Sequence, residues 1–176
     1  MKYLNQNEKG LTLLEIIIVF GILGIILTIL GNFTLTSMKH YSMADDEVEI
    51  QYHAQIAMNE LIDKVMRTKG IKTVDGLATI SFYDSTKQKV KKISFDNAAN
   101  TDPTMKTLVI EHKYNELFYG YGNSATILFA NYIDTFIIKP MPLGKTYEDC
   151  LGIQISIKIK KKDSELLVEN EIYFRN

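Results

Sequence analysis

A long apolar run near the amino terminus organises this chain: residues 9–30 read KGLTLLEIIIVFGILGIILTIL. From Leu11 to Leu30 the run has 20 residues, about 30 Å as an α-helix, which suffices to cross the hydrocarbon core of a bilayer. One carboxylate, Glu15, interrupts the run. A charged carboxylate costs roughly 2.5–3.5 kcal/mol at the centre of a membrane helix and less near an end. The sequence therefore predicts a membrane-spanning helix in which some partner stabilises Glu15.

Length and composition leave room for one further domain of modest size. The chain has 176 residues and a formal net charge of -1, and no block of basic and aromatic residues indicates nucleic-acid binding. The single cysteine, Cys150, excludes an intramolecular disulfide. Because no basic residue adjoins Cys150, we interpret it as a small structural residue at a loop-to-strand junction rather than a reactive thiol.

The charges that flank the apolar run predict its orientation. Lys2 and Lys9 precede it, and acidic residues follow it from Asp45 to Glu49. Positive charge is retained on the cytoplasmic side, so the leader should be cytoplasmic and the remainder exported, to the periplasm or the extracellular space. A cleaved secretory signal has a shorter apolar core followed by a small-residue site, and residues 30–33 offer no such site.

The leader and the first residues of the run resemble a known family. Lys9-Gly10-Leu11-Thr12-Leu13-Leu14-Glu15 is similar to the class III leader of type IV pilins and type II secretion pseudopilins. The resemblance implies that a membrane-bound prepilin peptidase cuts between Gly10 and Leu11 and N-methylates Leu11. Glu15 becomes the fifth residue of the mature chain, where the family carries its glutamate. Leu11 is a departure, because phenylalanine is usual there, although the family tolerates other apolar residues.

Cleavage at this site would create a partner for Glu15. The new amino group of Leu11 is positive, and opposite charges attract more strongly in a low-dielectric medium than in water. If Leu11 of an incoming subunit lies beside Glu15 of its neighbour, both charges are paired and the glutamate sets the register of assembly. The alternative is a carboxylate that reaches the headgroups or is protonated.

The helix is predicted to continue beyond the membrane, from about Leu11 to about Lys69. No proline interrupts this stretch, and Gly70 is a credible C-cap. Val48 and Tyr52 weakly extend an apolar stripe that recurs at helical spacing, at Ala54, Ala57, Met58, Leu61, Ile62, Val65 and Met66. The opposite, polar side is expected to carry Asp45, Glu49, Gln55, Asn59, Glu60, Asp63, Lys64 and Arg67. Three glycines in this stretch are either points where the helix bends or locally unfolds, or sites of close packing against other helices. They are Gly21, Gly24 and Gly31.

After Gly70 the pattern changes to short segments rich in β-branched and aromatic residues, separated by turns. We expect strands at Leu77–Tyr83, Val90–Phe95, Thr107–Tyr114, Ala125–Tyr132, Thr135–Lys139, Gly152–Lys160 and Glu165–Phe174. Loops are expected at 97–103, 120–123 and 140–149. The predicted fold is α+β and pilin-like, with the long helix packed on a C-terminal antiparallel sheet. Its parts are a leader (1–10), a transmembrane helix (11–31), an amphipathic continuation (32–70) and a β-rich exported domain (71–176).

The last hairpin has the clearest pattern, because isoleucines alternate with polar residues from residue 153 to 160. A reversal through residues 161–164 would pair Ile159 with Leu166, Ile157 with Val168 and Ile153 with Ile172. On the wet face, the same register places Lys160 opposite Glu165 and Lys158 diagonal to Glu169. Four lysines lie at or near the tip of this hairpin, and we expect them to be solvated; the alternative is that they form a basic docking surface. They are Lys158, Lys160, Lys161 and Lys162.

The sequence predicts no enzyme, no metal site and no cofactor. His40, His53 and His112 lack metal-ligand spacing, so surface or hydrogen-bonded positions are expected for them. Glu148 and Asp149 suit calcium only generically. No catalytic motif occurs, and the expected covalent chemistry is done to the chain by prepilin peptidase.

The resemblance implies a structural subunit of a type IV pilus, a type II secretion pseudopilus or a competence (DNA-uptake) pseudopilus. Its expected partners are prepilin peptidase, other pilin or pseudopilin subunits, the inner-membrane assembly platform and membrane lipid. A long helix followed by a sheet with a terminal hairpin is similar to minor subunits of the J-type pseudopilin group, which sit at the tip. The alternative is a single-span anchored protein whose exported domain binds a partner without forming a fibre.

Overall fold

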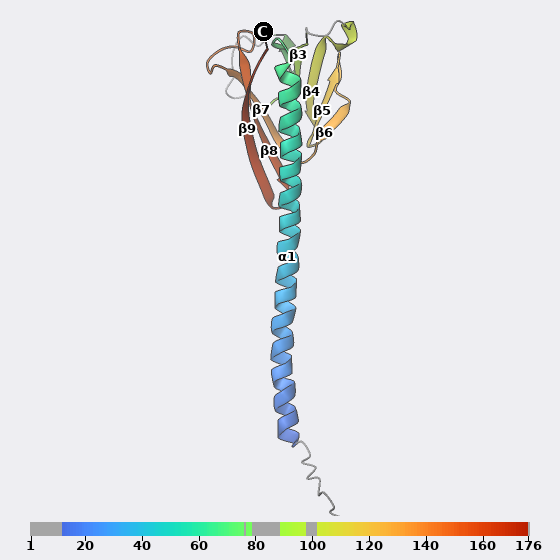
Figure 1. Ribbon diagram of the computed structural model, residues 1–176, viewed down its shortest axis with the longest axis vertical. Coiled ribbons are helices and arrows are strands. Elements are labelled where there is room, and N and C mark those ends of the chain that lie inside the picture. Colours follow the sequence, from blue (N-terminus) through green and yellow to red (C-terminus); the bar gives the residue numbers. More distant parts are fainter. Residues whose placement is uncertain (1–11, 76, 79–88, 98–101, 176) are drawn as a thin grey trace, which may run out of the picture. The chain divides into compact units, whose positions relative to one another are not determined.

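The computed structural model describes residues 12–75, 77–78, 89–97 and 102–175. In these residues a long helix, α1 (Leu13–Met66), precedes nine strands and a short 3-10 helix, Pro103–Met105 (Figure 1). The strands are β1 (Ile71–Val74), β2 (Leu77–Ala78), β3 (Lys92–Asp96), β4 (Thr107–Lys113), β5 (Glu116–Tyr121), β6 (Ile127–Ala130), β7 (Ile133–Met141), β8 (Gly152–Lys161) and β9 (Ser164–Tyr173). The chain divides into two compact units between Met43 and Ala44.

Helix α1 confirms the predicted continuous helix, but it ends differently. It stops at Met66, and Gly70 does not adopt the positive φ of a glycine C-cap. Instead, Thr68 ends the helix, because its backbone N–H and its hydroxyl both lie within hydrogen-bonding distance of the Val65 carbonyl, at 3.0 and 2.7 Å. Thr68 is fully buried, so this side chain satisfies a helix-end carbonyl that water cannot reach.

The β-rich part forms two antiparallel sheets, not the one sheet that the sequence led us to expect. One has the strand order β2-β1-β3-β4-β5-β6 and the other the order β7-β8-β9. In Figure 1 the two sheets lie on either side of the C-terminal part of α1. The helix and both sheets contribute to one hydrophobic core, so each covers an apolar face that would otherwise meet water. Its largest fully buried side chains include Phe95, Phe136, Leu61, Ile93 and Leu108.

Strands β1 and β5 were not predicted, and residues 120–121 lie in β5 rather than in the expected loop. The hairpin that joins β4 to β5 turns at Tyr114 and Asn115, whose φ angles are 55° and 60°. Such turns usually carry glycine, and this one has none. The other expected strands are present with shifted ends; residues 79–83 of the first lie outside the described residues.

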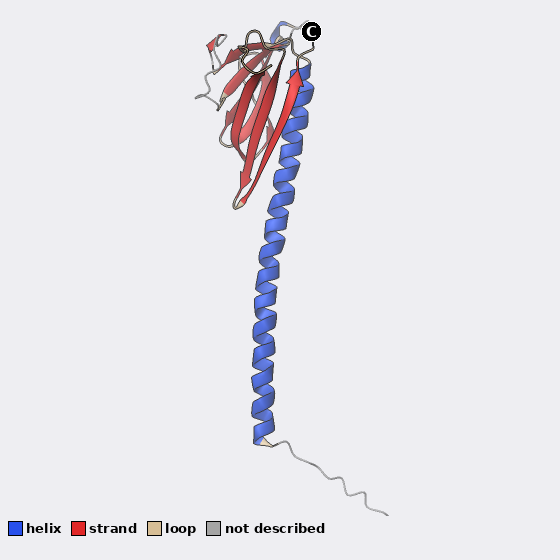
Figure 2. Cartoon of the chain, turned by 90° about the vertical axis from the view of Figure 1, so that its left-hand side faces the viewer, coloured by secondary structure: helices blue, strands red, loops and turns tan. Residues whose placement is uncertain are grey.

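The predicted register of the last hairpin is confirmed. Ile159 pairs with Leu166, Ile157 with Val168 and Ile153 with Ile172. Figure 2 shows this β8–β9 hairpin extending along α1. On the outer face Lys160 stands opposite Glu165, but the ion pair of Glu165 is with Lys158, at 2.8 Å.

The apolar stripe of α1 follows a slightly different line from the predicted one. Ala54, Ala57, Met58, Leu61 and Val65 are buried as expected. Towards the amino terminus, however, the buried positions are Ile50 and Asp46, whereas Val48 and Tyr52 are 65% and 59% exposed. Met66 is also exposed. The burial of Ile50 and Asp46 was not predicted, because an aspartate interrupts the hydrophobic pattern at this end of the stripe.

Candidate membrane and assembly site

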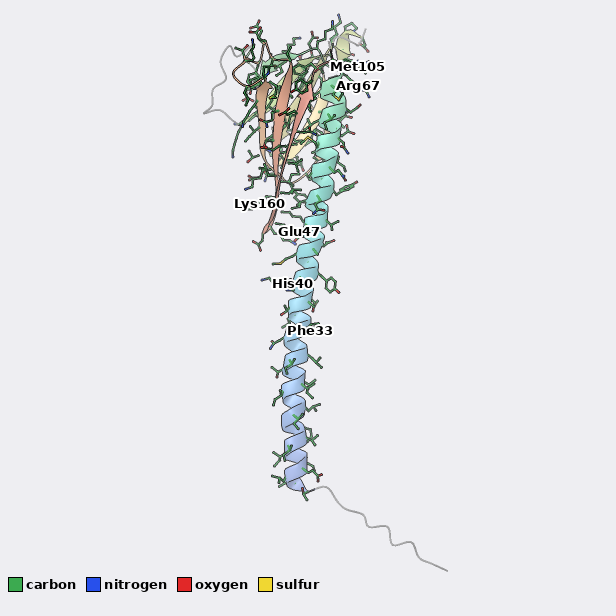
Figure 3. The ribbon with its side chains drawn as sticks, turned by 60° about the vertical axis from the view of Figure 1, so that its left-hand side comes forward. Phe33, His40, Glu47, Arg67, Met105 and Lys160 are labelled. Atoms are coloured by element: carbon green, nitrogen blue, oxygen red, sulfur yellow. The ribbon has the colours of Figure 1, made fainter. Side chains whose placement is uncertain are left out.

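The first unit presents an apolar helix on which no described residue packs. Every described residue from 12 to 36 is exposed, including Phe33, whose side chain projects outward in Figure 3. By length and composition, α1 can cross a membrane. A helix that is apolar on all sides requires an apolar environment, either lipid or other helices.

Glu15 lies in the first turn of this helix and forms a capping box with Thr12. The Thr12 backbone N–H donates to Oε2 of Glu15 at 3.4 Å, and the Glu15 backbone N–H donates to Oγ1 of Thr12 at 3.3 Å. This reciprocal pattern satisfies the Thr12 N–H, which has no carbonyl partner at the start of the helix, and adds to the hydrogen bond that the Glu15 N–H makes to the Thr12 carbonyl at 3.0 Å. The Thr-x-x-Glu spacing that signals such a box is present in the sequence at residues 12–15.

The capping box changes how the carboxylate of Glu15 is stabilised. A negative charge in the first turn also interacts favourably with the helix dipole, so part of its cost in an apolar medium is offset within the chain. The cap uses one carboxylate oxygen, and no described residue binds the other. Gly10 and Leu11, the expected cleavage site, lie outside the described residues.

The second unit contains a charged cluster that joins α1 to the tip of the β8–β9 hairpin. Lys161 Nζ lies 2.9 Å from Oδ1 of Asp46, and Lys162 Nζ lies 2.7 Å from Oδ2 of the same residue. Lys161 also pairs with Glu49, whose other oxygen accepts a hydrogen bond from the Tyr132 hydroxyl at 2.8 Å. The side chain of Asp46 is only 8% exposed.

These contacts shift the ionisation of the cluster. A hydrogen bond from Lys162, and to a smaller extent one from Lys161, lowers the pKa of Asp46. A hydrogen bond from Lys161, and to a smaller extent one from Tyr132, lowers the pKa of Glu49. The two carboxylates, Glu49 first, raise the pKa of Lys161. Each charge thus stabilises the charged form of its partner.

The cluster corrects the expectation of a fully solvated lysine tip. Lys161 and Lys162 are bound to α1, whereas Lys160 stays exposed at the hairpin tip (Figure 3). Glu49, expected on the polar side of the helix, faces the sheet. The available signal was the spacing of Asp46 and Glu49, which places both on one face of a helix.

The remaining candidate residues have structural environments. Cys150 is buried just before β8 and donates to the Tyr147 carbonyl at 3.2 Å, and burial raises its pKa to about 11. His112 Nε2 lies 2.9 Å from the Ile133 carbonyl. His53 is different, because its buried Nδ1 has no hydrogen-bond partner among the described residues. In the described part of the chain, no three His, Cys, Asp or Glu residues are placed to hold a metal ion.

Comparison with known families places a match at the amino terminus. The model of the prokaryotic N-terminal methylation motif matches residues 5–31, a range that contains Gly10, Leu11 and Glu15. The match supports a type IV pilin-like or pseudopilin-like protein that prepilin peptidase processes, and points to a structural role rather than an enzyme. Together with the apolar helix, it supports membrane anchoring. No curated protein and no solved structure matches the chain.

Proposed function

We propose that this chain is a structural subunit, of the minor class, in a type IV pilus or in a secretion or competence pseudopilus. Prepilin peptidase cuts after Gly10 and methylates the new amino group of Leu11. The leader is cytoplasmic, the apolar part of α1 is held first in the inner membrane and then in the fibre, and the β-rich part is exported. The assembly platform and sibling subunits are its partners.

One observation carries this proposal. The methylation motif at residues 5–31 overlaps a continuous helix whose described residues are exposed as far as residue 36 and predominantly apolar. The same helix then contributes to the core of a β-rich unit. A simple membrane anchor needs neither the glycine before the run nor the carboxylate within it. A subunit that must leave the lipid and pack against the helices of other subunits uses both.

Assembly depends in this proposal on Glu15. The capping box occupies one oxygen of its carboxylate, which leaves the other for the methylated amine of an adjacent Leu11. Two opposite charges in an apolar environment are far less costly together than apart. The pair therefore favours one stagger between neighbouring helices over all others.

The minor-subunit assignment rests on architecture. A long helix is followed by a β-rich part that ends in a β8–β9 hairpin, which is similar to the J-type pseudopilin group. A tip position follows from that likeness. The competing function is a single-span anchored binding domain that never enters a fibre, and the open strand edge described in the next subsection is the feature that favours it.

The mature amino terminus distinguishes these two functions. The full-length chain is co-expressed with a prepilin peptidase, extracted from membranes and analysed by mass spectrometry. We expect an N-methylated Leu11 as the first residue. The control Gly10→Val should retain Met1, because a β-branched side chain replaces the residue at which the peptidase cuts. An intact Met1 in the unmodified chain would refute the proposal.

A second measurement addresses the fibre itself. Epitope-tagged chain is expressed with sibling pilin or pseudopilin genes, and sheared fibres are separated from membranes. Recovery of the processed chain in fibres at a low ratio to the most abundant subunit supports a minor subunit. Processed chain that stays wholly in the membrane fraction supports the anchored binding domain.

A further inference from the structure

Among the strands that the structure describes, β9 has one edge of its sheet open. The three-stranded sheet has the order β7-β8-β9, and β9 pairs only with β8 among the described strands. The Lys160 backbone N–H donates to the Tyr132 carbonyl, away from β9, so Lys160 and its partner Glu165 do not exchange backbone hydrogen bonds. Hydrogen-bonded and non-hydrogen-bonded pairs alternate along an antiparallel ladder, so the backbone N–H and C=O groups of Glu165, Leu167, Glu169 and Glu171 point to the open edge. Of these, the Glu171 N–H already donates to Oδ1 of Asn170 at 2.8 Å.

A groove lies beside this open edge, between β9 and α1. Its volume is about 420 Å³. Apolar side chains line part of it, from Ala54, Met58, Ile62, Leu166 and Val168. Side-chain amides line the rest, from Gln51, Gln55, Asn59 and Asn170. Amides donate and accept hydrogen bonds without charge, so the groove suits a neutral, mainly apolar occupant.

We propose that the open edge of β9 and the adjacent groove bind an extended segment of a partner protein, which adds to the sheet as a further strand. Backbone hydrogen bonds to the outward groups of β9 would supply affinity, and alternate side chains would enter the groove and provide specificity. The available volume fits about three side chains of the size of valine or isoleucine. The inference does not depend on the proposed function.

Charge identifies the chemistry of the partner. The outer face of β9 carries Glu165, Glu169 and Glu171, of which Glu165 is paired with Lys158. Glu169 and Glu171 form no ion pair with any described residue. A strand added at this edge would place its outward side chains across from these carboxylates, where cross-strand opposite charges are favourable. The partner segment therefore alternates basic residues with small or β-branched apolar ones.

The edge has only part of the usual protection against such pairing. Exposed edge strands are commonly shortened, carry charged residues, or are interrupted by proline or a bulge, and of these devices β9 has only the charges of its three glutamates. Strand β9 has ten residues, pairs with β8 without a bulge, and contains neither proline nor lysine. An edge of this length that stays open indicates a binding surface.

The same carboxylates make a second copy of this chain an unfavourable occupant. Antiparallel pairing of two β9 edges centred on Glu169 would place this residue opposite itself. Centring on Leu167 would place Glu165 opposite Glu169. Like charges directly opposite each other destabilise a sheet, so the surface is selective against self-pairing.

The test uses the full-length chain in detergent micelles and a fluorescent peptide, Arg-Val-Arg-Val-Thr-Val-Arg, with binding followed by anisotropy. A peptide of equal composition, Arg-Arg-Arg-Thr-Val-Val-Val, controls for charge. Leu167→Pro removes an outward N–H without removing a bond to β8, and Leu167→Thr is its control. Gln55→Trp fills the groove, and Glu47→Trp, on an exposed position of α1 (Figure 3), is its control.

We expect the alternating peptide to bind at least about tenfold more tightly than the control peptide, and Leu167→Pro and Gln55→Trp each to weaken binding about tenfold. Leu167→Thr and Glu47→Trp should change it by less than about twofold. Hydrogen exchange should slow at the outward amides of β9 when the alternating peptide is added, a readout that also serves if Leu167→Pro unfolds the hairpin. Equal binding of both peptides, or exchange unchanged at β9, would overturn the proposal. Self-association of the chain that Gln55→Trp abolishes would assign the edge to a second copy instead, and also overturn it.

Discussion

The ammonium of Lys162 lies 2.7 Å from a carboxylate oxygen of Asp46, although 116 residues separate the two in sequence. Asp46 is 5% exposed and is also bound by Lys161. Desolvating the Asp46 carboxylate offsets much of this attraction, but without both lysines the carboxylate would be buried and unpaired. The contact therefore specifies where the hairpin tip meets α1 more than it stabilises the fold.

Acid should weaken the second unit through this cluster. The pKa values of Asp46 and Glu49 are lowered in the folded chain, so their contribution to the free energy of unfolding is present above the unfolded-state pKa of about 4 and is lost as the pH falls through the folded values. Thermal unfolding followed by circular dichroism at pH 7 and pH 3 should show a large drop for the unmodified chain. Asp46→Asn combined with Glu49→Gln should lower the midpoint at pH 7 and reduce the drop. Glu169→Gln is the matched control, and a drop of equal size in the double variant would contradict the cluster's role.

Two substitutions of Glu15 should distinguish its role in helix capping from its role in assembly. Glu15→Gln retains a side chain that can complete a capping box but removes the charge, whereas Glu15→Ala removes both. If the charge pair with a neighbouring Leu11 is worth about 1.4 kcal/mol or more, both variants should enter fibres about tenfold less than the unmodified chain. Mass spectrometry should show that both are still cleaved after Gly10. Normal incorporation of Glu15→Gln would mean that capping, not charge, is what assembly requires.

Gly152→Ala should destabilise the pairing of β8 with β9 at the open end of the hairpin, where Gly152 stands opposite Tyr173. A Cβ at this position would run into the carbonyl oxygen of Ile172 and lie 2.8 Å from the Cα of Tyr173. Both are backbone atoms, so relief requires the strands to separate, and overpacking of this kind costs about 1–3 kcal/mol. Gly70→Ala is the control, since a Cβ there meets nothing within 4 Å. Urea unfolding in detergent should give a lower midpoint for Gly152→Ala alone.

Cys150 should react only when the chain unfolds. Burial raises its pKa to about 11, so about one molecule in ten thousand carries the thiolate at pH 7, against about 3% for an ordinary thiol. A thiol-disulfide reagent should therefore modify the native chain far more slowly than the chain in guanidinium. Rapid modification of native chain at pH 7 would show that the thiol is accessible and would contradict its structural role.

The long helix and the last hairpin were predictable because their signals are local and repeated. From Leu13 to Met66 the helix has neither proline nor a competing period, and in β8 and β9 the hydrophobic alternation and the charge pattern require the same register. A slip of one residue would have turned Ile157 and Val168 towards solvent.

What the sequence did not reveal depends on contacts between distant segments. Asp46 is buried because two lysines from a hairpin over 100 residues away reach it. Strand β5 follows a turn at Tyr114 and Asn115 that has the backbone of a glycine turn without glycine. Two sheets formed where one was expected, since strand pairing across a sheet is not encoded in any one strand.

The position of the charged cluster has a mechanical consequence. If α1 is drawn out of the bilayer during fibre growth, tension travels along its backbone and reaches the second unit at Ala44. Within the next five residues it meets the salt links at Asp46 and Glu49, which pass the load to the end of the β8–β9 hairpin. That hairpin runs along α1 (Figure 2), so the load acts along its two strands together, and the backbone hydrogen bonds that join β8 to β7 share it as shear instead of being peeled apart one by one.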